Sequence, residues 1–73
     1  MVLDKVTKII AEVFQIGHTD VAAERDLTAY GMDSARAMDL VIAIEDMFEV
    51  EISDELMIQF RTANDIVRAL ETL

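Results

Sequence analysis

The chain contains no cysteine, only one histidine and few basic residues. Without cysteine, a disulfide framework and a thiolate zinc site are excluded, and one histidine cannot build a metal cluster alone. Six Lys and Arg stand against 15 Asp and Glu, which gives a formal net charge of −9. This charge opposes binding to nucleic acids and to anionic membranes, so a basic protein partner is expected.

Long apolar runs are absent as well. No run approaches the roughly 20 residues that a membrane-spanning helix needs. The first 14 residues alternate apolar and charged side chains, whereas a targeting segment places a continuous apolar stretch after a basic start. We therefore expect no membrane insertion, and predict a soluble cytoplasmic protein or one domain excised from a larger one.

Apolar residues are nevertheless abundant, because 53% of the 73 residues are hydrophobic. Disordered segments combine high charge with few apolar residues, so the composition favours a folded chain. A chain this short cannot divide into two cores. The sequence therefore predicts a single domain over residues 1–73.

The first half predicts one amphipathic helix and a long loop. The helix is predicted from apolar residues at helical spacing, which are Leu3, Val6, Ile10 and Val13. Gly17 is expected to end it. Residues 15–33 show no sustained period, and loops of this length tend to be functional or to pack through their own side chains. Leu27 and Tyr30 are the expected apolar anchors of this loop.

The second half predicts three further helices. One begins at Ser34, after Asp33 as N-cap, and runs to Phe48 with an apolar stripe at Ala37, Leu40 or Val41, Ile44 and Phe48. Residues 49–53 alternate acidic and apolar side chains but have no partner strand, so we expect an extended linker.

Two shorter helices complete the prediction. Residues 54–60 form the third, using Leu56, Ile58 and Phe60. Thr62 and Asp65 form a capping box that begins the last helix, with its stripe at Ala63, Ile66 or Val67, Leu70 and Leu73. The expected fold is all-α: a small four-helix bundle with a short third helix and a long loop between helices one and two.

Catalytic signals are nearly missing. Ser34 follows Gly31, Met32 and Asp33, but a nucleophile elbow needs Gly-x-Ser-x-Gly after a strand, and none is predicted. A triad would need His18 as its base, and a lone histidine in a loop is usually solvated. Residues 46–55 lack the central glycine and ligand spacing of a calcium loop. We therefore predict no catalytic residue and no metal site.

Charge gathers on one part of the chain. Residues 33–55 hold eight acids and one base, Arg36, and so carry most of the net negative charge. Met38 and Ile42 lie off the apolar stripe on the acidic side, which favours a docking face over an ordinary solvated helix face. Ser34 stands at the positive end of a helix, where a phosphate is favoured, although Asp33 or Ser34 could simply cap that helix.

Three segments resemble the acyl carrier protein family: residues 30–34 (Tyr-Gly-Met-Asp-Ser), 40–48 and 50–55. The resemblance extends over almost the whole chain, from the amphipathic first helix and the long loop to the final helix after Thr62. The resemblance implies that Ser34, beside Asp33, receives 4'-phosphopantetheine from coenzyme A. The arm's thiol would then carry acyl groups as thioesters between enzymes of fatty-acid, polyketide or related specialised biosynthesis. The chain itself would not be an enzyme.

The resemblance also implies partners and sites. A phosphopantetheinyl transferase and acyl-loading and acyl-processing enzymes would dock through basic patches onto a monomeric chain. The docking residues would be Asp33, Arg36, Met38, Asp39, Ile42, Glu45 and Asp46. The acyl chain would lie among Leu40, Val41, Ile44, Ile52, Ala63 and Ile66.

Two residues beside the attachment point depart from the family pattern. Ala35 replaces a bulky aliphatic residue, and Arg36 brings a positive charge where the family commonly has an acidic or neutral residue. The alternative function is a non-enzymatic acidic adaptor that binds a basic protein without modification, with Ser34 serving only as a cap.

Overall fold

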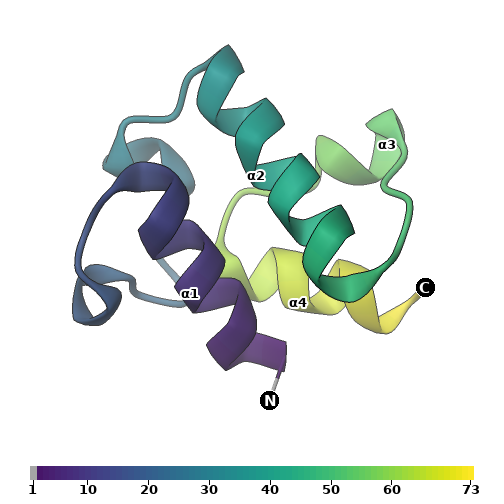
Figure 1. Ribbon diagram of the computed structural model, residues 1–73, viewed down its shortest axis with the longest axis horizontal. Coiled ribbons are helices and arrows are strands. Elements are labelled where there is room, and N and C mark those ends of the chain that lie inside the picture. Colours follow the sequence, from purple (N-terminus) through teal and green to yellow (C-terminus); the bar gives the residue numbers. More distant parts are fainter. Residues whose placement is uncertain (1) are drawn as a thin grey trace.

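Four α-helices surround one core in the computed structural model, which describes residues 2–73 (Figure 1). The helices are α1 (Val2–Phe14), α2 (Ser34–Phe48), α3 (Asp54–Met57) and α4 (Ala63–Glu71). The long loop contains two 3₁₀ turns, η1 (His18–Asp20) and η2 (Leu27–Tyr30), and no strand occurs within the described chain. The predicted all-α architecture with a short third helix is therefore confirmed.

Helix α1 buries the expected stripe but ends earlier than predicted. Val6 and Ile10 are fully buried, and Phe14 is the last helical residue. Gln15 then adopts the left-handed conformation (φ 57°), and the N–H of Ile16 bonds the carbonyl of Ala11 at 3.0 Å. The prediction that Gly17 ends the helix is thus wrong, because the chain turns earlier and packs Ile16 against the core.

The long loop is held by its own side chains, as predicted. Leu27 is 2% exposed and belongs to the core. The hydroxyl of Tyr30 accepts a hydrogen bond of 2.9 Å from the N–H of Ala22, and its ring lies 5.8 Å from that of Phe14. Both predicted anchors therefore contact the rest of the fold.

Backbone hydrogen bonds also join the long loop to the connection between α3 and α4. The N–H of Leu27 donates to the carbonyl of Arg61 at 2.7 Å, and the N–H of Asn64 donates to the carbonyl of Ala23 at 3.1 Å. In Figure 1 the loop lies at the left and α3 at the right of α2. The two bonds thus bring together segments that are far apart in the sequence.

Helix α2 begins at the predicted residue because Asp33 caps it. The carboxylate of Asp33 accepts a hydrogen bond of 2.8 Å from the backbone N–H of Arg36. The helix buries one stripe (Leu40, Val41 and Ile44) and contributes with α1 and α4 to the core. It ends where Glu49 takes the left-handed conformation (φ 55°), and the following residues 50–53 form neither helix nor strand.

Helix α3 is shorter than predicted. Ser53 caps it by accepting a hydrogen bond of 3.1 Å from the N–H of Leu56, and the helix ends at Met57. Ile58, which was predicted to face the core, is 73% exposed. The apolar spacing was misleading here because residues two positions apart lie on opposite sides of a helix, and the helix ends before either Ile58 or Phe60.

Helix α4 has the predicted capping box. The hydroxyl of Thr62 accepts the N–H of Asp65 at 3.1 Å, and the carboxylate of Asp65 accepts the N–H of Thr62 at 3.2 Å. Ala63 and Ile66 are fully buried. Leu73 lies beyond the end of the helix and is 60% exposed, so its predicted place in the apolar stripe is wrong.

Candidate functional site

The two serines of the chain both stand at the start of a helix but in different states. Ser53 is the N-cap of α3, and its hydroxyl accepts the N–H of Leu56. Ser34 is the first residue of α2, where Asp33 already serves as the cap. Among residues 2–73, no side chain or backbone group forms a hydrogen bond with the Ser34 hydroxyl, and the residue is exposed. Ser34 is therefore the serine whose hydroxyl is available for chemistry.

The surroundings of Ser34 suit a phosphodiester. The first-turn N–H groups of a helix have no partner within the helix, and together with the helix dipole they favour a negative charge there. Gly31, three residues before Ser34, has φ 93° and ends η2. Ala35, the next residue, is also exposed. The hydroxyl is thus reachable from solvent at the electropositive end of a 15-residue helix.

Four of the predicted docking residues are exposed along one side of α2. Met38 and Ile42, one turn apart, are 54% and 55% exposed, and Asp39 and Asp46 are exposed beside them. We call these four residues the outer face of α2. Large exposed apolar side chains flanked by acids are typical of a protein contact surface. Asp33 is exposed at the end of the same helix.

The other two predicted docking residues have contacts inside the fold. Glu45 is half-buried, and its carboxylate accepts a hydrogen bond of 2.9 Å from the N–H of Ile52. Arg36 is half-buried, and its guanidinium donates a hydrogen bond of 3.3 Å to the carbonyl of Val13. Their sequence positions gave no signal of either contact, because both bonds depend on how distant segments meet.

Sequence reasoning also missed Ile58. This residue follows α3, and among residues 2–73 it has the largest exposed fraction of the large apolar side chains, 73%. No local signal in the sequence could have found it, because the cap at Ser53 marks only where α3 begins and not that it ends before residue 58.

The residues predicted to shelter an acyl chain form the closed centre of the bundle. Five of them are at most 7% exposed, and Ile52 is half-buried against the core; they are Leu40, Val41, Ile44, Ala63, Ile66 and Ile52. Interiors of this kind are close-packed. A chain lying among these residues would therefore require their side chains to move apart.

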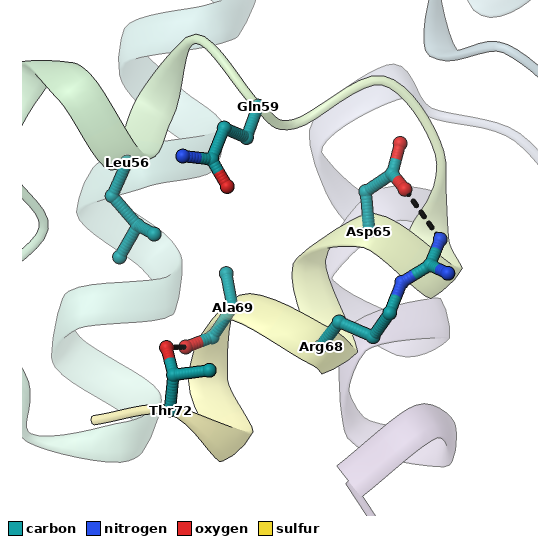
Figure 2. Close-up of a pocket in the computed structure, with 6 residues that line it drawn as sticks. All are labelled: Leu56, Gln59, Asp65, Arg68, Ala69 and Thr72. Atoms are coloured by element: carbon teal, nitrogen blue, oxygen red, sulfur yellow. Dashed lines mark hydrogen bonds and ion pairs between the residues drawn. The ribbon is translucent and has the colours of Figure 1, made fainter.

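A cavity of about 210 Å³ lies elsewhere, between α3 and α4 (Figure 2). Figure 2 shows Leu56 and Gln59 on the α3 side, Ala69 on α4 and Thr72 just after it, and the Asp65–Arg68 ion pair of 2.6 Å at the edge. None of the six predicted acyl-pocket residues lines it. Helix α3, beside the cavity, is only four residues long.

Neither a membrane span nor a metal site is found within residues 2–73. No described helix has the length and apolar character to cross a bilayer. No group of three or more His, Asp or Glu side chains in the described chain is arranged to hold a metal ion.

Comparisons with known proteins agree with this geometry. The family model described as the phosphopantetheine attachment site matches residues 4–70. The acyl carrier protein of Phytoplasma mali (strain AT) is 35% identical over 72 residues, which cover 97% of this chain and 86% of that protein. Among solved structures, the chain resembles a free-standing peptidyl carrier protein from an uncharacterized Acinetobacter baumannii secondary metabolic pathway. The TM-score is 0.79 at 21% identity, over 92% of this chain and 84% of that one, and at this identity the likeness concerns the fold alone.

Proposed function

Because the chain belongs to the family of proteins with a phosphopantetheine attachment site, we propose that it is an acyl carrier protein whose arm is attached to Ser34. The observation that carries this proposal is the free, exposed hydroxyl of Ser34 at the start of α2, beside a cap provided by Asp33. We further propose that residues 1–73 act as one monomeric carrier domain in the cytoplasm. The chain would be a substrate and partner of enzymes and would have no catalytic residue of its own.

In the proposed modification, the Ser34 oxygen forms a bond to the phosphorus of coenzyme A that bears the pantetheine. The pyrophosphate bond breaks, adenosine bisphosphate leaves, and the hydroxyl proton passes to a base of the phosphopantetheinyl transferase. The first turn of α2 favours the new phosphodiester through its dipole. When bound, the arm supplies the thiol that a chain without cysteine lacks, and this thiol carries acyl groups as thioesters.

The outer face of α2 is the proposed contact for successive enzymes. Its carboxylates, Asp39 and Asp46, would meet Lys and Arg side chains, and Met38 and Ile42 would supply apolar contact. Charge complementarity chiefly speeds encounter and selects partners, which suits a carrier that must also dissociate. Fatty-acid, polyketide and related pathways are all compatible with this face.

The test is the intact mass after incubation with coenzyme A and a phosphopantetheinyl transferase. The wild type and Ser53→Ala should both gain the mass of one arm, whereas Ser34→Ala should gain none. Ser53→Ala is the matched control because it removes the other serine, which also begins a helix. A wild type that stays unmodified with several transferases would instead favour the acidic adaptor.

A further inference from the structure

Arg36 is the one base beside the eight acids of residues 33–55. Its guanidinium donates to the carbonyl of Val13, at the end of α1. Asp39 lies one turn along the same helix, at a spacing that suits an ion pair. Within residues 2–73, however, no ion pair joins Arg36 to an acid.

The carbonyl of Val13 is one of the last four of α1, which have no partner inside their helix. Two of the others are satisfied by the chain reversal: Ala11 accepts the N–H of Ile16, and Glu12 accepts that of Gln15. Val13 is satisfied by Arg36 instead. Helix α1 has no basic residue in its own last turn, so the positive charge that a carbonyl end favours comes from α2.

This contact joins two of the α-helices through a side chain, across 23 positions of the sequence. Arg36 also donates its backbone N–H to the carboxylate of Asp33 at 2.8 Å. One residue thus bonds the cap of α2 through its backbone and the end of α1 through its side chain, two positions after Ser34.

We propose that Arg36 is a positioning residue that fixes the Ser34-bearing first turn of α2 against the end of α1. In this role the guanidinium of Arg36 bonds the end of α1, so the outer face of α2 contains no base. The inference rests on the proposed function in that Ser34 is taken as the attachment site. We call the hydrogen bond from Arg36 to Val13 the anchor. It is a property of the unmodified chain and can be measured without any partner.

The anchor should matter for recognition more than for the chemical step. When the first turn opens, Ser34 is no longer in the conformation that a transferase binds. The apparent KM then rises in inverse proportion to the ordered fraction, whereas kcat of the bound complex is unchanged.

The experiment compares four forms of the full chain: wild type, Arg36→Met, Arg36→Lys and Thr62→Ala. Met keeps an aliphatic side chain and removes the donor, Lys keeps the charge and a donor, and Thr62→Ala weakens the capping box of α4 as a stability control. Amide hydrogen exchange of residues 33–38 is measured in each unmodified protein. The kcat and KM for arm transfer from coenzyme A are measured at a temperature at which every form is folded.

We expect Arg36→Met to exchange faster at residues 33–38 and to raise KM about threefold to tenfold at unchanged kcat. Arg36→Lys should restore most of the wild-type exchange rate and KM. Thr62→Ala should match the wild type in both quantities. Unchanged exchange in Arg36→Met would overturn the anchor. A raised KM without faster exchange would mean that Arg36 contacts the transferase directly, which also overturns it. If no transferase modifies the wild type, the proposed function fails, and the exchange rates still decide whether the anchor exists.

Discussion

The carboxylate of Glu45 accepts a hydrogen bond of 2.9 Å from the backbone N–H of Ile52, across the turn that leaves α2. The backbone carbonyl of Glu45 also accepts the N–H groups of Glu49 and Val50. One residue therefore holds both the end of α2 and the linker that carries Ile52 against the core. The docking role that the sequence suggested for Glu45 stays a prediction beside this internal contact.

Removing the Glu45 carboxylate should destabilise the fold. We expect Glu45→Ala to lower the free energy of unfolding by about 1 kcal/mol, because the N–H of Ile52 loses a charged acceptor at a half-buried site. Glu45→Gln keeps an acceptor and should lose less. Urea denaturation measures both, with Asp46→Ala as the exposed control, for which a change within about 0.5 kcal/mol is expected. Equal losses in Glu45→Ala and Asp46→Ala would contradict a role for the Ile52 bond.

Two alanines of α4 should respond oppositely to enlargement. Ala69 is the buried residue beside the 210 Å³ cavity, and we expect Ala69→Leu to raise the free energy of unfolding by about 0.5–1 kcal/mol because it fills existing space. Ala63 is fully buried in the core, where Ala63→Leu should cost about 1–3 kcal/mol through overpacking. Thermal and urea unfolding of the pair test this. A destabilised Ala69→Leu would mean that the cavity does not accept the side chain.

The two glycines should also differ in how much their replacement by alanine lowers stability. Gly31 has φ 93°, a conformation that costs an L-residue about 1–2 kcal/mol, so Gly31→Ala should be destabilised by that amount although the space around it is open. Gly17 has an ordinary φ of −68°, and a methyl group there would meet only the end of the Asp20 side chain. Gly17→Ala should therefore change stability by less than Gly31→Ala in urea denaturation. The reverse order would argue against the left-handed turn before Ser34.

Asp65 should make stability depend on acid pH. Partial burial raises the pKa of the Asp65 carboxyl, but hydrogen bonds from Arg68 and Thr62 outweigh it and hold this pKa below its ordinary value of 3.8. A lowered folded pKa stabilises the protein above the unfolded pKa, and this stabilisation disappears as the pH falls through the folded value. The Arg68 side chain is 71% exposed, so we expect Asp65→Asn to lose only about 0.5–1 kcal/mol at pH 7.

That difference between wild type and Asp65→Asn should shrink below pH 4 as the wild-type carboxyl gains its proton. Urea midpoints of the two proteins, measured between pH 2 and pH 7, provide the check. A difference that stays constant over this range would assign the loss to the altered capping box and not to the charge.

The sequence predicted those helix boundaries that local side chains determine. Asp33 before Ser34, and Thr62 with Asp65, cap their helices within three residues, so the starts of α2 and α4 could be predicted. The end of α1 could not, because Gln15 takes a left-handed conformation that a glycine would ordinarily occupy. Tertiary packing of Ile16 outweighs that local preference.

Only part of the candidate site could likewise be predicted from the sequence. Ser34 could be proposed from its motif, and its exposure and lack of a hydrogen-bond partner agree with that proposal. The contacts of Arg36 and Glu45 join residues 23 and seven positions apart. Such pairs are set by how helices and linkers meet, which residue spacing along one helix does not encode.

The two backbone bonds between the long loop and the α3–α4 connection also bear on the order in which the protein is made. The loop needs the carbonyl of Arg61 and the N–H of Asn64 to complete its hydrogen bonds. Both groups are made after α1, α2 and α3. The segment that leads into Ser34 therefore reaches its final form only after residues 61–64 have been made, and a transferase that recognises the folded loop would act after that point.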